Sequence, residues 1–65
     1  MNPFQVGDRV KMSDADNPNA IPAYRALRGV VVSVHGDSSV RVHWDCDKSP
    51  DVFPRHVSTI APAND

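Results

Sequence analysis

The chain has a single cysteine, no long apolar run and no recognisable leader. Because Cys46 has no second cysteine to pair with, a disulfide within the chain is excluded and a reducing compartment is expected. No apolar stretch approaches the ~20 residues that a bilayer-spanning helix needs. Residues 1–8 contain neither the basic nor the apolar region of a secretory signal. We therefore expect a small cytoplasmic protein that does not associate with membranes.

Glutamate is also absent, and charge of neither sign dominates. The chain holds 7 Lys and Arg residues and 8 acidic residues, all of them Asp, for a formal net charge of −1. A non-specific nucleic-acid binder usually has a clearly basic domain. The charge balance therefore argues against that class, while one local basic face stays open.

The 65 residues allow at most one domain with a limited core. Hydrophobic residues make up 40% of the chain and valine is prominent among them, which favours strands. Alternation with a period of two, together with the turn-forming residues between the runs, predicts five short strands. They are expected at residues 8–12, 30–34, 40–44, 51–53 and 57–60. Residues 1–61 then form one domain, and residues 62–65 form a frayed tail.

Two short helical segments are expected between these strands. Residues 13–20 are turn-forming types that predict a surface loop, and residues 21–27 predict one or two helical turns. Pro22 suits the first helical position, and Gly29 suits the position past the helix end. A 3₁₀ turn is expected at Arg55 and His56.

The valine-rich hairpin has a register that follows from its apolar pattern. If Val34 pairs with Val40, both strands turn their apolar side chains to one buried face. That face carries Val30, Val32, Val34, Val40, Val42 and Trp44. The connecting turn is then residues 36–38, and Arg41 and His43 point away from the core.

Three segments, at residues 6–10, 27–31 and 40–44, carry a likeness to a known family. They read VGDRV, LRGVV and VRVHW. They resemble the Gly-Asp-x-Val strand and the Gly-x-Val hairpin of the KOW and Tudor-like branches of the SH3-like small β-barrels. The likeness spans nearly the whole chain. It implies an all-β, five-stranded SH3-like barrel with a long loop and a short helical turn after the first strand, acting as a binding module for protein, RNA or DNA.

A second likeness is to the plasmid-borne type II dihydrofolate reductases, which are tetrameric enzymes of SH3-like fold. Phe4 and residues 7–10 match their Phe-x-x-Gly-Asp-Arg-Val opening. Their pore strand reads Val-Gln-Ile-Tyr-Pro, and residues 50–54 of this chain read PDVFP. Asp51 stands where that family has its ligand-binding glutamine, and Phe53 stands where it has tyrosine. Because a carboxylate in the pore disfavours an anionic cofactor, we expect no such enzyme and no cofactor.

The end of the second hairpin strand is rich in metal-ligand types. They are His43, Asp45, Cys46 and Asp47. A structural zinc site needs paired Cys or His at fixed spacing, and a second pair is missing. A cysteine nucleophile needs a histidine base and an orienting group, which no local pattern marks. We therefore predict no metal site and no catalytic residues, and interpret the cluster as polar residues at a strand end.

Two surfaces remain as candidate binding sites. Loops on a rigid barrel usually carry function, so the first surface joins the long loop to the connection before the last strands and predicts a protein partner. It comprises Tyr24, Arg25, Phe53, Pro54 and Arg55. The second surface is a basic stripe on the exterior, which would contact the phosphates of RNA or DNA. It comprises Arg9, Lys11, Arg41 and His43. An exposed strand edge also allows a homodimer.

Overall fold

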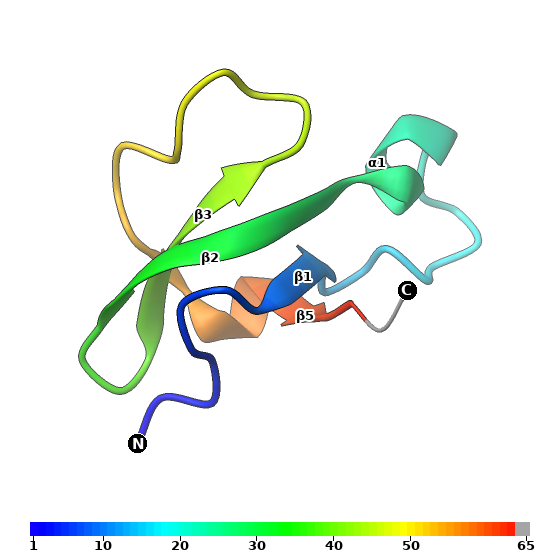
Figure 1. The fold of residues 1–65 in the computed structure, drawn as a ribbon. Coiled ribbons are helices and arrows are strands. Elements are labelled where there is room, and N and C mark those ends of the chain that lie inside the picture. Colours follow the sequence, from blue (N-terminus) through cyan, green and yellow to red (C-terminus); the bar gives the residue numbers. More distant parts are fainter. Residues whose placement is uncertain (64–65) are drawn as a thin grey trace.

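The chain folds into one antiparallel sheet of five strands in a computed structural model, which describes residues 1–63. In chain order the elements are β1 (Arg9–Met12), α1 (Pro22–Ala26), β2 (Arg28–His35), β3 (Ser39–Trp44), β4 (Arg55–His56), the 3₁₀ helix η1 (Val57–Thr59) and β5 (Ile60–Pro62). The strand order β4-β3-β2-β1-β5 makes β4 and β5 the two edges (Figure 1). The β class and the five strands are confirmed. Within the described residues no pairing between β4 and β5 closes the sheet, although η1 joins them along the chain.

The inner face of the sheet carries the core. Val10, Val40 and Val42 are completely buried, and Val31 is 1% exposed. The core cluster is completed by Phe4, Trp44 and Ile60. Full burial of a valine or a similar side chain contributes about 1.5–3 kcal/mol, which is a large share of the stability of so small a domain. The expected inward position of Trp44 is confirmed.

A β-bulge in β2 changes the expected register of the hairpin. Val34 pairs with Val40 and His35 pairs with Ser39, so the turn at residues 36–38 is confirmed. Further along, Val31 pairs with Val42 while Ser33 pairs with Arg41, which leaves Val32 as an extra residue in β2. A bulge of this kind reverses the faces of the residues beyond it.

The predicted inward positions of Val30 and Val32 are therefore wrong. Val31 faces the core instead, while Val30 pairs with His43 on the outer face. Val34 keeps its pairing but is 38% exposed, because it lies near the end of the hairpin.

Gly29 lies inside β2 opposite Trp44, and not beyond a helix end as expected. A Cβ at this buried position would lie 2.7 Å from Val42 Cγ1 and 2.8 Å from Trp44 Cε3. Contacts below 3 Å are shorter than carbon atoms tolerate, so only glycine lets Trp44 pack against this backbone.

The helix predicted over residues 21–27 is confirmed as α1, with Pro22 in its first turn. It lies at the end of β2 that is remote from the β2–β3 turn (Figure 1). None of the five residues of α1 is buried, and the adjoining Leu27 packs against the core. Ile21, an expected anchor, is 67% exposed. The helix is thus held mainly from its C-terminal end.

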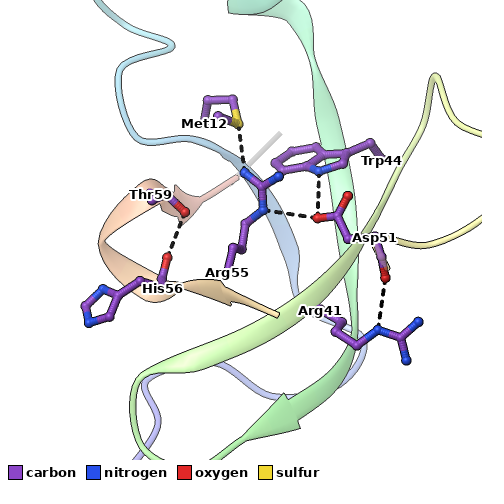
Figure 2. A network of polar contacts seen from close by, with 7 residues as sticks. All are labelled: Met12, Arg41, Trp44, Asp51, Arg55, His56 and Thr59. Atoms are coloured by element: carbon purple, nitrogen blue, oxygen red, sulfur yellow. Dashed lines mark hydrogen bonds and ion pairs between the residues drawn. The ribbon is translucent and has the colours of Figure 1, made fainter. Parts of the chain in front are cut away.

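The predictions for residues 51–60 are wrong in their boundaries. Residues 51–53 form no strand, and the fourth strand is Arg55–His56, where a 3₁₀ turn was expected. The 3₁₀ helix begins two residues later because His56 caps it: its Nδ1 accepts the backbone N–H of Ser58 at 3.0 Å. Its carbonyl oxygen also accepts the Thr59 hydroxyl at 2.7 Å (Figure 2). The last strand is shifted accordingly to Ile60–Pro62.

The C-terminal residues stay paired further than the sequence predicts. Pro62 belongs to β5, and the backbone N–H of Ala63 donates to the carbonyl oxygen of Arg9 at 3.0 Å. Of the expected tail, residues 64–65 lie outside the described part. Neither helix of residues 1–63 is long and apolar enough to cross a bilayer.

Candidate functional site

The connection between β3 and β4 forms an outward bulge at the edge of the sheet. Val40 pairs with Arg55 in the ladder, and the N–H of Asp51 donates to the carbonyl oxygen of Val42 at 2.9 Å. The two-residue span from Val42 to Val40 on β3 therefore lies opposite the four-residue span from Asp51 to Arg55. The excess chain between Asp51 and Arg55 is pushed outward, and the whole connection projects away from the sheet (Figure 1).

The excess residues are apolar and lie in solvent. Val52 is 80% exposed and Phe53 is 79% exposed, and the exposed Pro54 follows them. We call residues 52–54 the apolar loop. Single exposed apolar side chains are ordinary, but a contiguous apolar patch on a small protein marks a contact surface.

Asp51 anchors the start of the apolar loop through its carboxylate. Its Oδ2 accepts the indole N–H of Trp44 at 3.3 Å and the Nε–H of Arg55 at 3.1 Å (Figure 2). The side chain of Asp51 is 19% exposed and that of Arg55 is 28% exposed, so the ion pair is shielded more than a surface pair would be. Since Arg55 follows the apolar loop, this pair clamps its two ends together.

Three further contacts support the clamp. The guanidinium of Arg55 lies over the Trp44 ring, with Cζ 5.0 Å from the ring centroid, which is cation–π geometry. Its Nη1 also approaches Met12 Sδ at 3.7 Å. On the outer side, Nε of Arg41 donates to the carbonyl oxygen of Asp51 at 3.0 Å (Figure 2). Asp51, which precedes the apolar loop, is therefore bound to the core through Trp44 and to the outer face of the sheet through Arg41.

The five residues predicted to bind protein lie on three segments, and Arg55 begins β4. Phe53 and Pro54 lie in the apolar loop, whereas Tyr24 and Arg25 lie on α1. Partial burial raises the pKa of the Tyr24 hydroxyl, and a hydrogen bond with Asp14 raises it further. The charge of Arg55 acts on the same pKa in the opposite direction, so Tyr24 lies within electrostatic reach of the clamp.

The four residues predicted to bind nucleic acid all face outward from the sheet. The register places Arg9 and His43 on either side of Val30, Lys11 beside Arg28, and Arg41 beside Ser33. Their common outward direction is as the sequence predicts.

Most of these basic groups are engaged with nearby acceptors. Arg9 forms an ion pair with Asp45 at 3.0 Å, and Lys11 forms one with Asp16 at 2.9 Å. The ring Nε2 of His43 lies 3.0 Å from the carbonyl oxygen of Asp47. The resulting outer face is basic in its strands and partly neutralised by the loops that border it.

The His-Trp-Asp-Cys-Asp segment divides as its pleat predicts. Trp44 points inward, while the side chain of Cys46 is exposed and contacts Asp47 at 3.8 Å. No group of three potential metal ligands is found among residues 1–63. An open hollow of about 270 Å³ lies at this segment and is lined by Val30, His43, Trp44, Asp45 and Asp47.

Sequence reasoning missed the structural role of Asp51. It treated Asp51 as a strand residue, whereas its carboxylate joins Trp44 to Arg55. The available signal was the pair of prolines at positions 50 and 54, which interrupts strand pairing on both sides of VF.

The comparisons with known proteins assign no family. No family model, no curated protein and no solved structure matches the chain.

Proposed function

We propose that the chain is a non-catalytic binding module that contacts another protein through the apolar loop. The observation that carries the proposal is the exposure of Val52 and Phe53, at 80% and 79%, on a loop clamped at both ends. Burial of these side chains in a partner contributes about 25 cal/mol for each Å² of apolar surface removed from water. Because the clamp already orders the loop, little conformational entropy is lost on binding.

The contacts of the basic residues favour a protein partner over nucleic acid. Proteins bind nucleic acids largely through Lys and Arg side chains that contact the phosphates of the backbone. Arg9 and Lys11 instead form ion pairs with Asp45 and Asp16. An aromatic platform for stacking bases is also missing from the outward-facing strand residues of the described sheet, apart from histidines.

The sheet edges favour a partner at the apolar loop over a homodimer at an edge. The edge strand β4 has two residues and β5 has three. Pro62 in β5 has no N–H to donate. Short edges that contain proline are poor templates for pairing with a second copy.

An SH3-like barrel is the fold that we propose for this module. Its support is the strand order together with η1, which connects the two edge strands as a closing turn would. The long connection with α1 between β1 and β2 supports the same architecture. The exposed free thiol of Cys46 fits the reducing compartment expected for it.

The absence of catalysis is part of this proposal, and the chemistry of the polar residues supports it. Asp51, which aligns with a ligand-binding glutamine of the type II reductases, uses its carboxylate to hold Trp44 and Arg55. His43 and Cys46 each contact Asp47, through its carbonyl oxygen and its carboxylate respectively. These contacts engage Asp51, His43 and Cys46 within the connection between β3 and β4.

The test is affinity capture from a lysate of the source cells, with and without nuclease treatment. Phe53→Ala and Val52→Ala should abolish most of the capture, and nuclease should have no effect. Val6→Ala is the matched control, because Val6 is 65% exposed and precedes β1, which β2 and β3 separate from β4 in the sheet. Tyr24→Ala tests whether α1 belongs to the same surface and should weaken capture to a smaller degree. Unchanged capture by Phe53→Ala would refute the proposal.

A further inference from the structure

Arg41 and Arg55 both border the apolar loop, but of the two only Arg55 forms a recorded ion pair within residues 1–63. The Nε of Arg41 donates to the carbonyl oxygen of Asp51 at 3.0 Å, and Arg41 belongs to none of the ion pairs recorded among residues 1–63. Figure 2 shows its terminal nitrogens directed away from the Asp51–Arg55–Trp44 cluster. Arg55 is neutralised by Asp51. The guanidinium of Arg41 is therefore fixed in position, and its charge has no counter-ion in the described part of the chain.

The outer face beside Arg41 consists of groups that favour an anion. Ser33 pairs with Arg41, and the next row along the hairpin holds His35, Ser39 and His56 side by side. These are hydroxyl groups and imidazoles, which can donate hydrogen bonds, although Ser33 Oγ already lies 2.8 Å from His35 Nε2 and Nδ1 of His56 lies 2.8 Å from Ser58 Oγ. No strand of the described sheet contains an acidic residue, so nothing on the strands around Arg41 repels a carboxylate.

We propose that the partner surface that receives the apolar loop carries a carboxylate, which pairs with the guanidinium of Arg41. This inference rests on the proposed function. The two terminal nitrogens of Arg41 provide the fork that a carboxylate accepts in bidentate fashion. Because the apolar loop is convex, the partner presents an apolar hollow, and its acidic side chain lies on the rim that faces Arg41.

The apolar side chains and Arg41 therefore have different roles: the first supply affinity, and the second sets the orientation of the partner. Burial of Val52 and Phe53 supplies most of the affinity and is indifferent to the direction of approach. The Arg41–carboxylate pair is directional and suppresses partners whose rim is basic. The surface therefore favours partners whose apolar hollow has an acidic rim over partners whose apolar hollow lacks one.

The experiment places the photoreactive residue p-benzoyl-phenylalanine at position 53 of the full chain. The chain is irradiated in a lysate of the source cells, and mass spectrometry identifies the crosslinked segment of the partner. We expect an apolar segment with Asp or Glu beside it in the partner's fold. Arg41→Glu should lower the crosslinking yield at least about tenfold, since close interfacial charge pairs contribute more than ~1.4 kcal/mol. Val6→Glu, which introduces a negative charge at an exposed position outside both candidate surfaces, is the control and should keep the yield.

A charge exchange completes the test. Replacing the partner's acidic residue with Lys should weaken its binding to the wild-type chain and restore its binding to Arg41→Glu. A crosslinked segment without an acidic neighbour, or an unchanged yield from Arg41→Glu, overturns the carboxylate pairing and leaves the apolar loop as the contact. A nuclease-sensitive product, or a yield no higher than with the same photoreactive residue at position 6, overturns both the pairing and the proposed function.

Discussion

The guanidinium of Arg55 lies over the ring of Trp44, with Cζ 5.0 Å from the ring centroid, while Asp51 binds both side chains through one carboxylate oxygen. The pair links the core to the loop, because Trp44 is buried and Arg55 directly follows the apolar loop. The same three side chains therefore contribute both to the stability of the fold and to the position of the apolar loop. Mutations can separate these two contributions.

Asp51→Ala should lower the free energy of unfolding by about 1–3 kcal/mol, the range for a group left without its charged hydrogen-bond partner. The reason is that the indole N–H of Trp44 and the Nε of Arg55 lose their common acceptor. Urea unfolding followed by the fluorescence of Trp44 measures the change. Asp45→Ala removes an exposed ion pair with Arg9 and should change stability by less than about 1 kcal/mol. Equal losses in the two variants would show that Asp51 is no anchor.

Gly29→Ala should destabilise the fold by about 1–3 kcal/mol, because a core with no spare room is overpacked by one methyl group. The added Cβ would lie 2.7 Å from Val42 Cγ1 and 3.0 Å from the backbone oxygen of His43. Gly36→Asn is the contrasting variant. Gly36 has open space around it and a φ of +64°, which asparagine tolerates, so its loss should stay below about 1 kcal/mol. Thermal unfolding of both variants measures the difference, and a Gly36→Asn loss as large as that of Gly29→Ala would contradict the close approach at Gly29.

The same substitution at two valines should separate folding from binding. Val42→Ala, at a completely buried position, should lower the free energy of unfolding by about 1.5–3 kcal/mol. Val52→Ala, at a position that is 80% exposed, should change it by no more than about 0.5 kcal/mol and yet weaken partner capture. Chemical denaturation and capture of the same two samples provide the comparison. A marked loss of stability in Val52→Ala would show that the apolar loop packs on its own fold.

The ion pair between Lys11 and Asp16 should be visible in the titration of the carboxylate. The hydrogen bond and the charge of Lys11 lower the pKa of Asp16 below its ordinary value. A lowered folded-state pKa means that the stabilisation is present above the unfolded pKa and is lost as the pH falls through the folded pKa. Lys11→Met should raise the pKa of Asp16 toward the ordinary value, as followed by carboxyl NMR resonances. An unchanged pKa would mean that the pair does not persist in solution.

The hairpin illustrates what the sequence can predict. The valine alternation and the polar residues 36–38 determine the turn, because only one register there pairs Val34 with Val40. The bulge at Val32 is invisible to the same reasoning, since in a run of valines every position satisfies the apolar pattern equally well. The observed register places Gly29 opposite Trp44, where a Cβ would lie 2.8 Å from Trp44 Cε3, and the valine pattern carries no trace of this cross-strand contact.

For the candidate site, the sequence indicates surface residues of the apolar loop but predicts the wrong secondary structure for this segment. Phe53 and Pro54 were singled out, and both are exposed in the apolar loop. Their expected strand is wrong because the side chain of Asp51 binds across to Trp44 and Arg55, and such a long-range contact leaves no periodic trace in the sequence. The proposal that this surface binds protein stays a prediction.

The pairing of β1 with β5 has a consequence for how the chain folds. It joins Met12 to Ile60, near opposite ends of the described chain, whereas the β2–β3 hairpin closes through a short local turn. Loop-closure entropy makes the distant pairing the slower event, so we expect the hairpin to nucleate and the terminal strands to dock last. During synthesis, a nascent chain that stops short of Ile60 cannot complete the sheet, and Val10 lacks its partner Pro62 in β5 until the last strand emerges.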